Sequence, residues 1–392
     1  MCRRNIRAYY KACVNVLPCH PQCVRKSTAL DNKPGSIYMR IQLRSHAPLP
    51  APGMRIGYFL KTMLDNYNRD INYLRVSITD RCNLRCMYCM PKEGLSLIGH
   101  DDILRYEEMS RIIRVAVDMG IRKIRLTGGE PLARRGVVDF IASLKTIPDL
   151  KDISLTTNGI LLADFAGNLF HAGVRRINIS LDSLNPEKYE RITRGGNLNA
   201  VLKGIDEVYR IGFSPIKINI VAIKGFNDDE ILDFARLSID KPYQIRFIEL
   251  MTIGSADLDQ ESKYLSNDVI REKIREMYSL DPVDGERKRI DGPARIYRIA
   301  GGAGEIGFIS PVSHQFCHSC NRLRLTADGH LRACLLSDEE TDLKGALRNG
   351  CSDKNLEDLI KEAIARKPMR HDLACDEGHI KKCMKDMSSI GG

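Results

Sequence analysis

The chain has 392 residues, 43% of them hydrophobic and 28% charged, which is enough for two or three globular domains with a sizeable core. Its 13 cysteines in so long a chain do not fit a small disulfide-stapled domain, and metal ligation accounts better for at least six of them. Charged residues interrupt every apolar run well before the ~20 residues that a bilayer requires, so we expect no transmembrane helix.

The net charge of +10 is confined to the first 64 residues, which hold eleven Lys or Arg and a single acid, Asp31. The rest of the chain is therefore formally neutral. An Arg-rich, acid-poor segment of irregular pattern is typical of a mitochondrial transit peptide, and a basic interaction tail is the alternative. We predict that residues 1–64 are a transit peptide, that the protein lies in the mitochondrial matrix, and that Cys2, Cys13, Cys19 and Cys23 are lost with this leader.

From residue 72 onward, short β-branched runs alternate with longer amphipathic ones, as in repeated βα units around a parallel sheet. In the stretch EEMSRIIRVAVDMG, for example, Met109, Ile112, Ile113 and Ala116 share one face, and Gly120 indicates a helix end. Since eight βα units close a full barrel, six predict an incomplete α/β barrel, (β/α)6, over residues 65–252. We expect the irregular residues 253–392 to close its open side. The six predicted strands begin at Leu74, Lys123, Ile153, Arg176, Ile216 and Tyr243.

The run ITDRCNLRCMYCMP, directly after the first predicted strand, carries Cys82, Cys86 and Cys89 in the spacing CxxxCxxC. A four-iron cluster normally takes one thiolate per iron, so three cysteines leave one iron open to a ligand that is not protein. An open coordination position is typical of a catalytic metal site. A structural zinc site and ordinary core cysteines are the alternatives, but neither predicts this spacing.

Polar motifs follow the next three predicted strands, where the loops of a parallel βα fold converge. They are Gly128-Gly129-Glu130-Pro131, Thr156-Thr157-Asn158-Gly159 and Ser180-Leu181-Asp182. Each alone reads as a turn or a helix cap. Their shared placement at one rim favours a site.

A second set of cysteines, Cys317, Cys320 and Cys334, lies near the C-terminus as CxxC followed by thirteen residues. His314 or His318 offers a fourth ligand for zinc, so a zinc site remains an alternative on spacing alone. Arg322 and Arg324 follow the pair directly and, at i and i+2 of an extended segment, point the same way. Guanidinium groups match phosphate oxygens bidentately, so a phosphate beside the metal is the favoured interpretation.

Taken together, these motifs resemble the radical S-adenosylmethionine superfamily, and within it the GTP 3′,8-cyclase (molybdenum cofactor biosynthesis protein A) family in its eukaryotic mitochondrial form. The resemblance runs from about Tyr73 to the Gly391-Gly392 tail, which in this family reaches into the active site. It implies a lyase that converts GTP to (8S)-3′,8-cyclo-7,8-dihydroguanosine 5′-triphosphate, the first step of molybdopterin biosynthesis. Cys351, Cys375 and Cys383 match no motif of that family.

The resemblance also implies two [4Fe-4S] clusters, one on Cys82, Cys86 and Cys89 and one on Cys317, Cys320 and Cys334. The first would bind S-adenosylmethionine and generate the radical that removes hydrogen from C3′ of GTP, and the second would present its open iron to the guanine. Tyr88, Gly129, Ser180 and Met251 would contact S-adenosylmethionine. Arg322, Arg324, Gly391 and Gly392 would join the first cysteines in catalysis. The implied GTP contacts are Arg75, Lys123, Arg125, Thr156, Lys217, Arg322 and Arg324.

Two other functions compete with this interpretation. A radical peptide maturase with an auxiliary cluster is the nearest enzyme, and a zinc-binding nucleic-acid module is the alternative of another class. We expect neither nucleic acid nor membrane as a partner. The expected partners are GTP, an electron donor, the downstream cyclic pyranopterin monophosphate synthase and, as a family expectation, a second copy in a homodimer.

Overall fold

The computed structural model describes residues 61–254, 258–259, 261–283, 292–371, 383, 385–387 and 389–391. The predicted leader lies almost wholly outside these residues, as do Cys375 and Gly392. None of the helices in the described part of the chain is long and apolar enough to cross a membrane.

Six parallel strands form the centre of the sheet in sequence order. They are β1 (Tyr73–Ser77), β2 (Lys123–Thr127), β3 (Asp152–Thr157), β4 (Arg176–Ser180), β5 (Ile216–Ala222) and β6 (Tyr243–Glu249). All six predicted strands are therefore confirmed, to within one residue at their starts. The β-branched residues that predicted them fill the core between sheet and helices, as Ile177, Ile179 and Ile218 illustrate.

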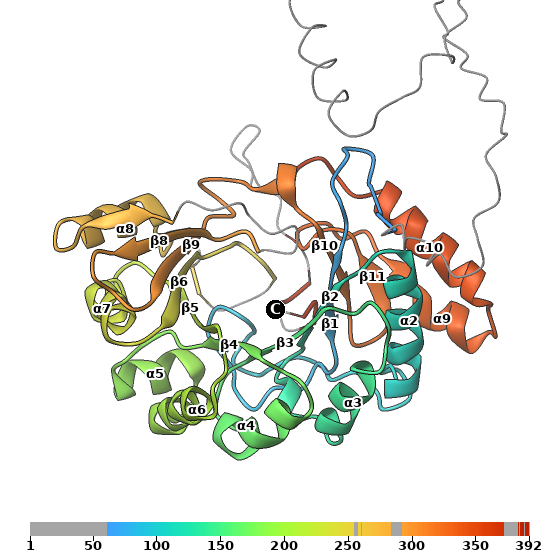
Figure 1. Cartoon of the computed structure of the whole chain (residues 1–392), viewed down its shortest axis with the longest axis horizontal. Coiled ribbons are helices and arrows are strands. Elements are labelled where there is room, and N and C mark those ends of the chain that lie inside the picture. Colours follow the sequence, from blue (N-terminus) through green and yellow to red (C-terminus); the bar gives the residue numbers. More distant parts are fainter. Residues whose placement is uncertain are drawn as a thin grey trace, which may run out of the picture. The chain divides into compact units, whose positions relative to one another are not determined.

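Helices connect the strands and cover the outer face of the curved sheet (Figure 1). They are α2 (Tyr106–Met119), α3 (Val137–Leu144), α4 (Leu162–His171), α5 (Pro186–Thr193), α6 (Leu198–Ile211) and α7 (Ile231–Asp240), with the short 3-10 helix η1 (Pro131–Ala133) after β2. The predicted face of α2 is confirmed, since Met109, Ile112, Ile113 and Ala116 are all buried. Gly120 ends this helix with φ of 140° and donates its N–H to the last turn.

The C-terminal region adds strands to both edges of the same sheet. After α8 (Asn267–Arg275), β9 (Glu305–Ile309) pairs in parallel with β6 and is followed outward by β8 (Arg295–Ile299) and β7 (Leu280–Pro282). At the other edge β10 (Arg322–Leu325) pairs in parallel with β1, followed by β11 (His330–Arg332) and β12 (Thr341–Asp342). The chain then continues through α9 (Leu343–Arg348) and α10 (Asp353–Ala365).

The resulting twelve-stranded sheet is open, with β12 at one edge and β7 at the other. This is the incomplete barrel that the six βα units predicted. Residues 253–392 were expected to close the open side of the barrel, and the structure shows that their described strands extend the sheet at both edges. This placement brings β10, with its two arginines, alongside β1.

Candidate active site

One cavity of about 320 Å³ opens at the carboxyl ends of the central strands, and both sets of cysteines line it. The loop after β1 supplies three thiols, whereas the segments before β10 and after β11 supply the other three. Sequence positions more than 200 residues apart thus meet because β10 pairs directly with β1. The cysteines in the lining are Cys82, Cys86, Cys89, Cys317, Cys320 and Cys334.

The first three thiols sit in a loop held by neighbouring polar groups. The Cys82 sulfur accepts from the backbone N–H of Leu84 at 3.4 Å and from the Asn158 amide at 3.8 Å. Burial raises the pKa of the Cys82 thiol and raises that of Cys86 well above its ordinary value. Thiolates here therefore require a bound cation, and metal ligation deprotonates a thiol outright.

Tyr88, between two of these cysteines, is fixed by an acid from the rim motif after β4. Its hydroxyl donates to Asp182 at 2.7 Å, and the second oxygen of Asp182 accepts from the N–H of Val221 at 2.8 Å. Burial raises the pKa of Asp182 to about 6 despite these two donors. The cysteine loop is thereby tied to the ends of β4 and β5.

The predicted turn after β2 requires glycine because two loops pass in contact. A Cβ atom on Gly129 would lie 2.3 Å from the carbonyl oxygen of Arg81, whereas its N–H donates to Thr79 at 2.7 Å. Glu130 next to it is fully buried, and burial raises its pKa to about 7. Its carboxylate joins the second and third strand ends by accepting from Leu132, Thr157 and Asn158.

The second three thiols lie on segments braced by two buried cations. Arg69 donates to the carbonyl of Cys317 at 2.8 Å. Lys367 donates to the carbonyls of Arg322, at 2.9 Å, and Ala333, which flank Cys320 and Cys334. Burial opposes ionisation of Cys320, yet the charges of Arg322 and Lys367 lower its pKa to about 6. A thiolate is therefore favoured at this position even before metal binds.

Among the described residues, no three His, Cys, Asp or Glu side chains converge on a point that would hold a single metal ion. The thiols of each set nevertheless act electrostatically on one another. Three soft sulfur donors in each set, facing the cavity, fit the ligand chemistry of an iron–sulfur cluster.

Five arginines line the cavity and give it a strongly positive lumen: Arg75, Arg125, Arg246, Arg322 and Arg324. The pairing register sets three of them side by side, since Arg75 of β1 is opposite Arg125 of β2 and Arg324 of β10. Burial, aided by neighbouring arginines, lowers the pKa of Arg75 to about 10 and that of Arg246 to about 9. Concentrated buried cations of this kind favour an anionic ligand.

Several buried polar atoms in the cavity wall lack a hydrogen-bond partner within the described part of the chain. They are the Tyr73 hydroxyl, Arg75 Nε, Thr156 Oγ1 and Asn219 Oδ1. Buried polar groups are normally satisfied, so these four indicate a polar ligand that the cavity is built to receive. Both donors and acceptors occur among them, as recognition of a nucleotide requires.

Most of the predicted site residues meet at this cavity. Tyr88, Gly129, Ser180, Met251, Arg75, Arg125, Thr156, Arg322 and Arg324 join the six cysteines in its lining. Gly391 contacts two residues of that lining through its carbonyl, which accepts from Thr127 at 2.8 Å and from Arg75 at 3.2 Å. Gly392 lies outside the described residues.

Lys123 and Lys217 are buried in the lumen but are not part of the cavity lining. Lys123 forms an ion pair with Asp152 at 3.2 Å. Burial, together with the charges of Arg246 and other cations, lowers the pKa of Lys217 to about 5. On their strands, Lys123 and Lys217 stand two residues before Arg125 and Asn219, nearer the amino ends than these two lining residues.

Arg246, Asn219 and Asp182 are among the polar residues of the lining that were not predicted as site residues from the sequence. A signal existed for the first two, because Arg246 and Asn219 alternate with apolar residues on predicted strands in the same way as Lys217. Asp182 stood in a recognised motif, but only its contact with Tyr88 identifies what it does.

Comparisons with known proteins agree with this geometry. Residues 76–238 match the model of the radical SAM superfamily, and residues 243–373 match that of Molybdenum Cofactor Synthesis C. The crystal structure of Streptococcus suis SuiB shares the fold, with a TM-score of 0.50 at 14% identity, over 77% of this chain and 68% of that one. Fold and site together define a radical SAM protein.

Curated relatives narrow the class. GTP 3′,8-cyclases of Alkaliphilus oremlandii and Moorella thermoacetica are 48% and 49% identical to this chain over 330 residues, 84% of this chain and 100% of each relative. The chain belongs to the GTP 3′,8-cyclase family.

Proposed function

We propose that this protein converts GTP to (8S)-3′,8-cyclo-7,8-dihydroguanosine 5′-triphosphate and so catalyses the first step of molybdopterin biosynthesis. One observation carries the proposal: a single cavity brings two sets of three cysteines together with five arginines. A radical SAM domain alone accounts for one set. A substrate that carries a triphosphate accounts for the arginines, since charge-assisted contacts to phosphate contribute about 1.5–3 kcal/mol each.

The residues present fit the cofactors that the family implies. Cys82, Cys86 and Cys89 would hold the first [4Fe-4S] cluster, and Tyr88, Gly129, Ser180 and Met251 would surround S-adenosylmethionine beside it. When bound, this pair supplies an organic radical that removes a hydrogen atom from the substrate. The protein would orient the substrate and exclude water from the cavity. Apolar side chains in the cavity wall, such as Ile248 and Leu336, contribute to this exclusion.

The second cysteine set is proposed to hold a further [4Fe-4S] cluster on Cys317, Cys320 and Cys334. Three observations support it: the thiols share the cavity, Arg69 and Lys367 brace their backbone, and the pKa of Cys320 is lowered to about 6. GTP would bind between the two sets, with its base toward the second. Arg322 and Arg324 adjoin Cys320, so they are placed to hold the phosphates of the same nucleotide.

Within the lumen, Arg75, Arg125 and Arg324 lie in one row across β2, β1 and β10. Their guanidinium groups would hold the triphosphate in a fixed position, while Thr156 and Asn219 offer unpaired oxygens to the ribose or base. A fixed pose matters because only the hydrogen nearest the radical source should be removed.

The test is anaerobic incubation of iron-reconstituted protein with GTP, S-adenosylmethionine and dithionite, followed by chromatography. We expect 5′-deoxyadenosine and a cyclised guanosine product in parallel. Formation of 5′-deoxyadenosine with no change in GTP would overturn the substrate assignment. Omission of GTP is the matched control, because it separates futile cleavage of S-adenosylmethionine from coupled turnover.

We further propose that the protein acts in the mitochondrial matrix, as the eukaryotic form of this family. The support is the composition of residues 1–64, with eleven basic residues and one acid. Fusion of these residues to a fluorescent protein should give a protease-protected mitochondrial signal. A diffuse cytosolic signal would contradict the assignment. An electron donor, the downstream cyclic pyranopterin monophosphate synthase and a second copy of the chain are the proposed partners.

A further inference from the structure

The C-terminal tail, of which residues 383, 385–387 and 389–391 are described, contributes Met387 to the cavity lining. Ile390 is fully buried and packs in a small apolar cluster with Ile253 and Cys383. The carbonyl of Cys383 accepts from the N–H of Gly254 at 2.9 Å, so the tail is tied to the loop after β6. At its far end the Gly391 carbonyl accepts from Thr127 and Arg75.

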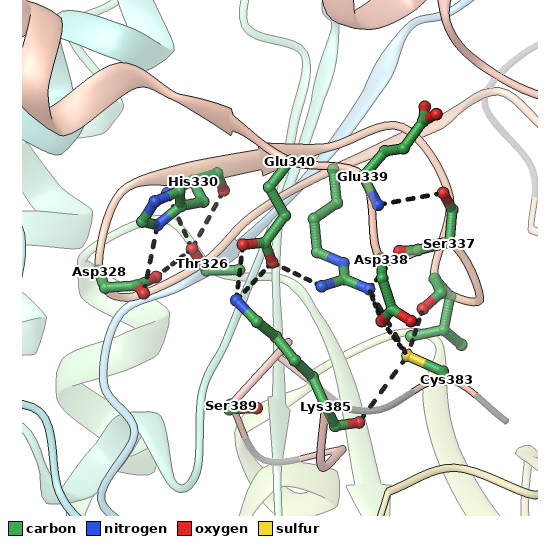
Figure 2. A network of polar contacts seen from close by, with 12 residues as sticks. Thr326, Asp328, His330, Ser337, Asp338, Glu339, Glu340, Cys383, Lys385 and Ser389 are labelled. Atoms are coloured by element: carbon green, nitrogen blue, oxygen red, sulfur yellow. Dashed lines mark hydrogen bonds and ion pairs between the residues drawn. The ribbon is translucent and has the colours of Figure 1, made fainter.

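A three-residue ion bridge ties the tail to the segment that follows β11 (Figure 2). Glu340, which follows β11, accepts from Arg332 at 2.5 Å on one side and from Lys385 of the tail at 2.6 Å on the other. Cys383 adds to this contact, since its sulfur lies 3.5 Å from an Arg332 nitrogen and 3.4 Å from Asp338.

The two ends of this bridge differ in burial. The Arg332 side chain is 0% exposed, whereas that of Lys385 is 40% exposed and that of Glu340 is 15% exposed. A buried guanidinium needs its carboxylate, so Arg332 holds Glu340 in place whether or not the tail is docked. Glu340 is therefore a preformed anchor, and Lys385 is the group that engages or releases it.

The anchor also lies close in sequence to the second set of cysteines, and Arg332 contacts both regions. Arg332 ends β11, Cys334 follows two residues later, and Arg332 donates to the Ser337 carbonyl as well as to Glu340. The same guanidinium thus shapes the loop after Cys334 and receives the tail. Docking of the tail and the conformation of this loop are coupled through one buried side chain.

We propose that Glu340 and Lys385 are positioning residues, which hold the C-terminal tail on the barrel so that the Gly391 carbonyl stays on Arg75 and Thr127. Neither residue is itself part of the cavity lining. Their effect on turnover rests on the proposed function, because Arg75 acts on the substrate only if the cavity binds GTP. Their effect on the position of the tail does not depend on the proposed function, and it can be measured without substrate.

Cys383 supplies the readout for the docked tail. It is 1% exposed, with its sulfur enclosed by Arg332, Asp338 and Leu335. Undocking exposes this thiol to a small alkylating reagent. Mass spectrometry of the peptide that contains Cys383 separates its modification from that of the other cysteines.

The experiment compares Lys385→Met, Lys385→Arg and Lys361→Met in the full chain. Lys361 is the matched control, because its side chain is 53% exposed and forms an ion pair with Glu357 at 2.5 Å within α10. Lys385→Met removes a partly exposed ion pair, so we expect Cys383 to be alkylated roughly five-fold faster in this variant than in the wild type. The thermal midpoint of unfolding should be unchanged. Lys385→Arg restores the slow rate, and Lys361→Met leaves it as in the wild type.

Equal alkylation rates in Lys385→Met and the wild type would overturn the proposal that Lys385 holds the tail on Glu340. So would faster alkylation that is accompanied by a fall in thermal midpoint and is not rescued by arginine, since that pattern marks general destabilisation. If the anchor holds, GTP turnover in the three variants follows Cys383 protection. If the alkylation rates follow the expected pattern but the protein never cyclises GTP, the proposed function is rejected and the proposed role of Glu340 and Lys385 in holding the tail is kept.

Discussion

Replacement of Lys217 by methionine offers the sharpest test of the positive lumen. Lys217 in β5 is 7% exposed, and its pKa is lowered to about 5 by burial and by the charges of Arg246 and Arg125. At pH 7 the amine is therefore neutral in the folded protein without ligand, whereas in the unfolded chain it carries its proton.

The magnitude follows from the two pKa values. Between the ordinary value of 10.5 and pH 7 lie about 3.5 pH units, which correspond to roughly 5 kcal/mol as an upper limit. The folded pKa lies below the unfolded one, so the unfolded chain binds the extra proton from about pH 5 to 10.5, and stability rises with pH through that window. Lys217→Met removes this slope and raises the thermal midpoint of the ligand-free protein at pH 7.

Ligand binding should reverse the protonation. A triphosphate bound by the lining arginines would offset their charge, which together with burial lowers the pKa of Lys217, so GTP binding at pH 7 takes up protons in the wild type. Anaerobic calorimetry in two buffers of different ionisation enthalpy measures this uptake. Lys217→Met abolishes it, whereas Lys203→Met, on the exposed face of α6, retains it. Equal proton uptake in all three proteins, or a destabilised Lys217→Met, would show that Lys217 is not a buried neutral amine that gains a proton when GTP binds.

Three further changes test separate parts of the site. Lys367→Met removes donors to the carbonyls of Arg322 and Ala333, so we expect a lower thermal midpoint and a loss of up to half the bound iron; unchanged iron content would contradict the bracing role. Glu130→Gln removes a carboxyl whose pKa is raised to about 7, so the stability of the wild type should fall by roughly 3 kcal/mol relative to that of the variant as pH rises from 4.5 to 7, as chemical denaturation would show. Cys317→Ser should retain measurable cleavage of S-adenosylmethionine and lose the cyclised product; full activity would refute its role as a ligand beside the substrate.

Local patterns predicted the barrel because each βα unit carries its own signals. Alternation, helix faces and glycine stops lie within about 15 residues, and the structure confirms the six strands and the buried face of α2. The addition of β9 and β10 to the two edges was not predictable in this way. It depends on pairing between strands far apart in sequence, for which neither Glu305–Ile309 nor Arg322–Leu325 carries a local signal.

The site was predictable to the extent that its residues belong to spaced motifs. Both sets of cysteines reach one cavity as expected, and so does Arg75. The groups that brace the second set of cysteines were not predictable. In the sequence, Arg69 and Lys367 look like ordinary surface cations, and only the fold buries them against the segments that carry these cysteines. The same holds for Glu340, whose role is evident only once Arg332 and Lys385 meet on it.

We propose that the cavity holds GTP with C3′ facing the radical source. The most direct measurement uses GTP deuterated at C3′ with anaerobic, iron-reconstituted protein, S-adenosylmethionine and dithionite. We expect 5′-deoxyadenosine to gain one mass unit in step with formation of the cyclised product. Unlabelled 5′-deoxyadenosine formed at the same rate with and without GTP would contradict it.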